Sequence, residues 1–98
     1  MPSFTTRVEL HNATYQDYEN LHTAMFRAGF SRTITADDGK VYNLPTAEYD
    51  KIADLTISQI CDQAKMAANS TGKNNAVLVT QANGRMWNGL EQVQKRNY

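Results

Sequence analysis

Apolar or small residues alternate with polar ones at the start of the chain, from Phe4 to His11. One side of the pattern holds Phe4, Thr6, Val8 and Leu10, and the other holds Thr5, Arg7, Glu9 and His11. A period of two residues matches a β-strand, whose successive side chains point to opposite faces of the sheet. The pattern therefore predicts a half-buried strand with one polar face.

The next segment has the period of a helix. Its apolar side chains recur at intervals of three or four residues: Tyr18, Leu21, Met25 and Ala28. Thr14 and Asp17 have the spacing of a capping box at the start of a helix. Gly29 is the kind of residue that ends one. We expect a helix from Tyr15 to about Ala28.

Two strands of a hairpin follow, Phe30 to Ala36 and a second from Val41 onward. Asp38-Gly39 between them favours a two-residue primed turn, since glycine accepts a positive φ. This local signal predicts that the hairpin organises the fold. Pro45 cannot donate to a sheet ladder, so it indicates an edge or a bulge. Thr46 to Ile52 is then either a helical turn or, as we prefer, the strand resumed after the bulge.

The second half of the chain repeats the order helix, then strand. Thr56 and Gln59 have capping-box spacing at the head of a stripe of mostly small residues: Ile57, Ile60, Ala64, Ala67 and Ala68. Ala76 to Thr80 is a continuous apolar run, which predicts a strand buried on both faces. Asn83-Gly84 is a second primed-turn signal, and Arg85 to Asn88 is expected to return as a short fifth strand. Glu91 to Tyr98 is polar and is expected to fray.

These elements predict an α+β fold of the ferredoxin-like order β-α-β-β-α-β, in one domain spanning residues 1–98. Two helices cover one face of an antiparallel sheet in that arrangement. The other face stays open and polar. It would carry Thr5, Arg7, Glu9 and His11 from the first strand and Ser31, Thr33 and Thr35 from the second.

Composition narrows the class of protein. Hydrophobic residues make up 41% and charged residues 20%, as is typical of a folded chain. Ten Lys and Arg balance ten Asp and Glu, which argues against a strong nonspecific DNA binder. A single cysteine, Cys61, excludes a disulfide framework and a multi-cysteine zinc site. We predict no metal and no cofactor. Neither a signal peptide nor a membrane span is visible in the sequence, so we expect a cytoplasmic protein without membrane contact.

Arg7, Glu9 and His11 are the strongest candidates for chemistry. They share one face of one strand at intervals of about 7 Å. RNA cleavage without a metal needs a base for the 2′-hydroxyl, an acid for the leaving oxygen and a cation for the phosphate. A histidine, a carboxylate and an arginine supply that set. The competing interpretation is an ordinary solvated strand face.

Other candidates are weighed against structural roles. Asp37 and Asp38 fit turn chemistry better than a metal or acid pair. Arg32 is in phase with Phe30 and Ile34, which would aim it at the core, so we expect it to reach out to solvent or to pair with a carboxylate. His22 is interpreted as a boundary residue of the helix. Three aromatic side chains are suited to stacking on bases: Tyr42, Tyr49 and Trp87. In a core of this size, aromatic residues more commonly have a packing role.

The run from Tyr15 to Ser31, followed by Ile34-Thr-Ala-Asp-Asp-Gly39 and Tyr42-Asn-Leu44, resembles the GhoS family of type V antitoxins. The resemblance covers about residues 4 to 68, and Asn69 to Tyr98 has no counterpart in it. It implies a small ferredoxin-like protein, similar in fold to CRISPR-associated ribonucleases of the Cas two type. It also implies a sequence-selective endoribonuclease that cleaves the messenger RNA of a toxin. No catalytic motif is carried over.

The leading hypothesis is an antitoxin-like protein that acts on single-stranded RNA and is a candidate endoribonuclease. Its catalytic residues would be Arg7, Glu9 and His11, and Arg32, Thr33, Tyr42 and Tyr49 would bind RNA, with phosphates contacted by Arg7, His11 and Arg32. The alternative is a non-catalytic inhibitor or adaptor of phage or prophage type that binds a protein partner through a strand edge. A small-ligand regulatory domain is a weaker third hypothesis. An exposed edge and Trp87 further predict a homodimer through Val77 to Leu90.

Overall fold

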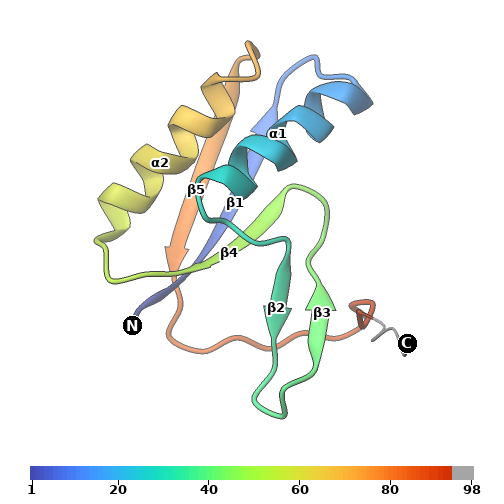
Figure 1. Ribbon diagram of the computed structural model, residues 1–98, viewed down its shortest axis with the longest axis vertical. Coiled ribbons are helices and arrows are strands. Elements are labelled where there is room, and N and C mark those ends of the chain that lie inside the picture. The colour runs from blue at the N-terminus through green and yellow to red at the C-terminus, as the bar shows by residue number, and fades with distance from the viewer. Residues whose placement is uncertain (94–98) are drawn as a thin grey trace.

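The computed structural model describes residues 1–93, in which two helices cover one face of a three-stranded antiparallel sheet (Figure 1). The strand order is β4-β1-β5, with β1 (Ser3–Leu10) between β4 (Glu48–Ile52) and β5 (Asn75–Gln81). The predicted ferredoxin-like α+β fold is confirmed. The central strand is β1 and not a strand of the hairpin, because only β1 pairs along its length with two neighbours.

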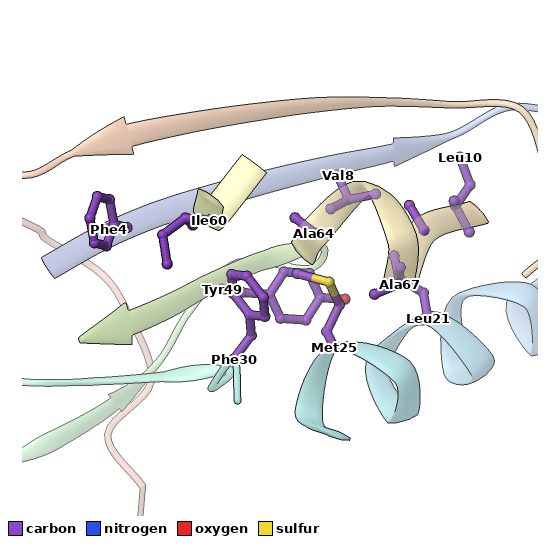
Figure 2. Close-up of a cluster of buried hydrophobic side chains, with 11 residues drawn as sticks. Phe4, Val8, Leu10, Leu21, Met25, Phe30, Tyr49, Ile60, Ala64 and Ala67 are labelled. Carbon is purple, nitrogen blue, oxygen red and sulfur yellow. The ribbon is translucent and has the colours of Figure 1, made fainter. Parts of the chain in front are cut away.

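The alternation along β1 sets which face of the sheet is buried. Phe4, Thr6, Val8 and Leu10 are buried, whereas Arg7 and Glu9 on the other face are exposed. The buried side chains pack against residues of both helices in a single core (Figure 2). That core comprises Phe4, Val8, Leu10, Leu21, Met25, Phe30, Tyr49, Ile60, Ala64, Ala67 and Ala68.

Both helices form where their capping signals predict them. Helix α1 (Tyr15–Arg27) begins with a capping box between Thr14 and Asp17, and Gly29 follows its end at φ +89°. Helix α2 (Ile57–Asn69) begins with a capping box between Thr56 and Gln59. Its small residues Ala64, Ala67 and Ala68 are buried against the sheet, as predicted. Within residues 1–93, neither helix is long and apolar enough to span a membrane.

The hairpin is shorter than predicted and forms a sheet of its own. Its strands are β2 (Thr33–Thr35) and β3 (Val41–Asn43). The turn is not primed, because Asp38 is not among the residues with positive φ. A three-residue loop, one of the common alternatives, instead places Gly39 alone at φ +86°. The strand does resume beyond Pro45, as β4.

The hairpin is joined to the main sheet at its start. Ser31 and Asp50 form an isolated antiparallel bridge, with N–H to oxygen distances of 2.8 Å and 2.7 Å. Through this bridge, the beginning of the predicted second strand lies beside β4. The ferredoxin-like order requires the second strand at this edge of the sheet. Further along, the hairpin diverges from the helices (Figure 1).

The end of the chain differs from the prediction in three respects. Strand β5 is not buried on both faces, because the helices cover only one face of the sheet (Figure 1) and Leu78 is 65% exposed. Among residues 1–93 it pairs with β1 only, so it is an edge strand. Arg85 to Asn88 forms no strand and no primed hairpin. Glu91 to Val93 does not fray, since it lies along β3, where Asn43 N–H donates to Glu91 O and Val93 N–H to Val41 O, both at 2.8 Å. The predicted fraying of 94–98 lies outside the described residues.

Candidate functional site

The face of the sheet opposite the helices carries the candidate site. On β1 this face presents Thr5, Arg7 and Glu9. Their register partners on the neighbouring strands are Glu48 and Asp50 of β4 and Ala76, Leu78 and Thr80 of β5. Both helices lie on the other side of the sheet (Figure 1). The open polar face that the sequence predicts is therefore present, although Leu78 adds an apolar group to it.

The side chains of Glu9 and His11 are in contact at one end of this face. His11 Nε2 lies 3.3 Å from Glu9 Oε1, and both side chains are exposed. The backbone N–H of His11 donates to Asn74 O at 2.8 Å, which fixes the residue just beyond the end of β1. A contact between two exposed side chains contributes little to stability, so Glu9 and His11 can separate to admit a substrate group.

Arg7 lies on the same face, two residues before Glu9. It is opposite Glu48 and Leu78 in the register, yet within residues 1–93 it forms no ion pair. A small hollow of about 150 Å³ is lined by Arg7, Glu9, Ala76, Val77 and Leu78. The guanidinium is thus available to an anion, for which its planar fork of donors is suited.

A second arginine, Arg85, reaches the same face from the C-terminal segment, residues 82–93. Its Nη1 lies 2.6 Å from Asp50 Oδ1 and 3.3 Å from Thr5 Oγ1. Asp50 is almost fully buried, so Arg85 supplies the charge that compensates it. Sequence reasoning missed this pair because 35 residues separate its members and no local pattern links them.

Tyr49 lies on the helix side of the sheet and does not share the surface of Arg7, Glu9 and His11. It is 0% exposed, which leaves no ring face for a base to stack on. In the described part of the chain, the one hydrogen bond of its hydroxyl is with His22 Nδ1, at 2.6 Å. Which of the two groups donates depends on the tautomer of His22.

Burial shifts the pKa values of the two residues in opposite directions. Desolvation, aided by the charge of Arg32, lowers the pKa of His22 below its ordinary 6.5. Desolvation also raises the pKa of Tyr49, which keeps its hydroxyl protonated. His22 is a boundary residue of the helix, as its place beside the apolar stripe predicts.

The remaining predicted RNA-binding residues belong to the hairpin side of the molecule. Arg32 is exposed, as expected, and its charge acts on His22 and Tyr49, which lie on the helix side of the sheet. The Thr33 hydroxyl lies 2.9 Å from that of Ser31. Tyr42 packs against Trp87, with ring centroids 5.6 Å apart. The structure thus brings together Arg7, Glu9 and His11, and separately Tyr42 and Trp87.

Asp38, one of the two adjacent acidic residues of the hairpin, has a turn role. Asp38 Oδ1 accepts a hydrogen bond from the backbone N–H of Lys40 at 3.0 Å, as Asx turns do. Within residues 1–93, no group of three or more His, Cys, Asp or Glu side chains is placed to hold a metal ion.

The family model described as "Endoribonuclease GhoS" matches residues 2–85. This range runs well past Asn69, so the resemblance to residues 4–68 that the sequence shows is too short: β5 and Arg85 also lie within the matched range. A comparison with curated proteins finds no match.

Proposed function

The chain belongs to the endoribonuclease GhoS family, and from this premise we propose that it binds single-stranded RNA on the open sheet face and cleaves it without a metal ion. The observation that carries the proposal is the row Arg7, Glu9 and His11, in which an unpaired guanidinium lies beside an exposed carboxylate–imidazole pair. The antitoxin role that the resemblance implies is part of the same proposal, in which the RNA is the message for a toxin.

The chemistry needs nothing beyond RNA and these side chains. The 2′-oxygen attacks the adjacent phosphorus while the bond to the 5′-oxygen of the next nucleotide breaks. The products are a 2′,3′-cyclic phosphate and a free 5′-hydroxyl. A base removes the proton of the 2′-hydroxyl, and an acid returns a proton to the leaving oxygen.

Each residue of the row has one role in the proposal. The Glu9 carboxylate takes the 2′ proton, the imidazolium of His11 protonates the leaving oxygen, and Arg7 stabilises the charge that develops on the phosphate. In-line attack places base and acid on opposite sides of the phosphorus. The contact of 3.3 Å between Glu9 and His11 therefore opens as the phosphate enters between them.

Cleavage of a labelled AU-rich single-stranded RNA in EDTA tests the proposal. We expect products with a cyclic phosphate end, and a rate lowered by about 10² or more in His11→Gln. The chain has two histidines, so His22→Gln is the matched control and should retain most of the wild-type rate. If the RNA stays intact and also does not bind at low salt, where phosphate contacts are strongest, the proposal is wrong.

A second candidate function, a non-catalytic inhibitor or adaptor that binds a protein partner, is favoured by the outer edge of β5. That strand is seven residues long and carries the exposed Leu78. A free strand edge can pair with a strand of another protein. Intact RNA, together with a stoichiometric protein complex that Leu78→Lys abolishes, would favour this function over RNA cleavage.

A further inference from the structure

We propose that the cleft around Trp87 binds an unpaired nucleobase of the RNA whose backbone lies along Arg7, Glu9 and His11. This inference rests on the proposed function and adds to it a place for a base. Two cavities of about 530 Å³ and 490 Å³ adjoin the C-terminal segment. Both are lined by Gly84, Arg85, Met86 and Trp87, so Trp87 borders both.

The lining of the cavities suits a flat ring with polar edges. The first cavity adds Tyr42 and a polar rim that includes Thr35 and Asp37. The second has an apolar lining of Ile34, Leu44, Pro45 and Leu90, with the polar groups of Thr5, Glu48 and Asn88 around it. Unpaired bases are bound in this way, with their faces on aromatic groups and their edges on polar ones.

Trp87 is oriented by its contact with Tyr42. The two rings are tilted by 62° in an edge-to-face arrangement, which leaves one indole face uncovered by Tyr42. Trp87 is only half-buried. An aromatic ring that is held by one neighbour and borders a cavity is already ordered. Stacking a base on it therefore costs little side-chain entropy.

The floor of the cleft is held by hydrogen bonds and adjoins the proposed cleavage site. Arg85 is fixed by Asp50 and Thr5, at 2.6 Å and 3.3 Å. Thr5 lines the second cavity and precedes Arg7 by two residues, a separation of about 7 Å along a strand. A nucleotide whose base enters the cleft can therefore direct its phosphate towards Arg7.

Two residues of the cleft, Met86 and Trp87, lie beyond residue 85, where the family match ends. Family membership therefore does not supply this site. The occupant that we infer is one unpaired nucleotide of a single strand, because a base in a duplex has no free face to stack on the indole.

Trp87 is the only tryptophan, so its fluorescence tests the inference directly. The probe is a short single-stranded RNA with 2′-O-methyl riboses, which cannot be cleaved, and its binding is followed in parallel by the anisotropy of a 5′ dye. We expect the indole emission to be quenched with the same midpoint as the anisotropy change. Duplex RNA of the same sequence should not quench it.

Substitutions separate stacking from folding. Trp87→Leu keeps an apolar side chain but removes the aromatic face, and should weaken binding about tenfold, whereas Trp87→Phe should retain most of the affinity. Tyr15→Ala removes an aromatic side chain that is 81% exposed on α1 and serves as the matched control, with unchanged affinity. Circular dichroism checks that each variant folds.

The outcomes distinguish this inference from the function on which it rests. RNA that binds by anisotropy without quenching, and with equal affinity to Trp87→Leu and wild type, overturns the base cleft and leaves the proposed function standing. RNA that does not bind at all contradicts the proposed function. Equal affinity for Trp87→Leu and Trp87→Phe, both weakened, would show that the position matters only for packing and would also overturn the inference.

Discussion

Among single residues, Tyr49 and His22 show how burial decides the role of a side chain. The sequence offers Tyr49 as a base-stacking residue, yet it is one of the largest fully buried side chains. Its hydroxyl makes a hydrogen bond of 2.6 Å to His22. The pair joins α1 to β4 on the helix side of the sheet and belongs to the core, at a distance from the proposed chemistry.

This pair predicts a dependence of stability on pH. The pKa of His22 in the folded protein is below its ordinary 6.5, so below pH 6.5 the unfolded chain binds a proton that the folded protein binds less readily. Stability should therefore be fully present above about pH 6.5 and be lost as pH falls through the lower folded pKa. Urea unfolding at pH 7.5 and pH 5 measures the loss.

His22→Gln isolates the contribution of this histidine, because carboxylates also titrate as the pH falls. The variant should lose less stability than wild type between the two pH values. His11→Gln, which replaces the exposed histidine, is the control and should follow wild type. Equal losses in His22→Gln and wild type would show that His22 does not titrate with unfolding.

At the scale of elements, the sequence predicts best the strands and helices that bury a single face, because that face gives a regular period of apolar residues. Strand β1 and helices α1 and α2 lie where alternation, apolar stripes and capping residues place them. A run of β-branched and apolar residues predicts that β5 is buried on two faces, but the helices cover only one face of the sheet and Leu78 is exposed. Which faces of a strand are covered depends on the packing of the whole sheet and not on the run itself.

The candidate site was predictable to the same extent. Alternation along β1 places Arg7, Glu9 and His11 on one face, and the structure does so. Alternation puts Arg32 in phase with Phe30 and Ile34, and this conflict with its charge makes it a candidate. The structure leaves Arg32 exposed, and its charge acts on His22 of α1. The pair Arg85–Asp50 could not be foreseen, because the position of the C-terminal segment depends on long-range packing.

The pair Arg85–Asp50 should be important for stability because it links the C-terminal segment to β4. Arg85→Ala is expected to cost about 3 kcal/mol, since it leaves a buried carboxylate without its partner. Asp50→Ala should cost less, because the Arg85 side chain is 26% exposed and that of Asp50 only 10%. Urea unfolding of both variants measures these values.

The double variant completes the cycle. Arg85→Ala with Asp50→Ala should be no less stable than Arg85→Ala alone, because the carboxylate that was left unpaired is gone. Additive losses would mean that the two side chains contribute independently, and that the contact of 2.6 Å does not stabilise the fold as a pair.

For the whole molecule, we propose a homodimer in which the outer edge of β5 pairs with that of a second copy. The sequence implicates Val77 to Leu90 in this contact. Trp87 packs on Tyr42 of its own chain, so the pairing surface is expected to be β5 and the exposed Leu78. Light scattering at micromolar concentration should give about twice the 11.0 kDa of one chain.

Leu78→Lys should return the particle to the mass of one chain by placing a charge on the pairing surface. Met66→Lys, at an exposed apolar position of α2, is the matched control and should stay dimeric. A wild-type particle of 11 kDa would contradict the dimer.

The central claim is that RNA binds along the open face of β1, and NMR mapping of backbone amides tests it most directly. The protein is titrated with the 2′-O-methyl single strand, and shifts are compared on the two faces of the sheet. We predict that the largest shifts fall at Arg7, Glu9, His11 and the adjoining residues of β4 and β5, and that the amide signals of α1 and α2 change little. Shifts confined to the helices, or no shifts at low salt, would contradict it.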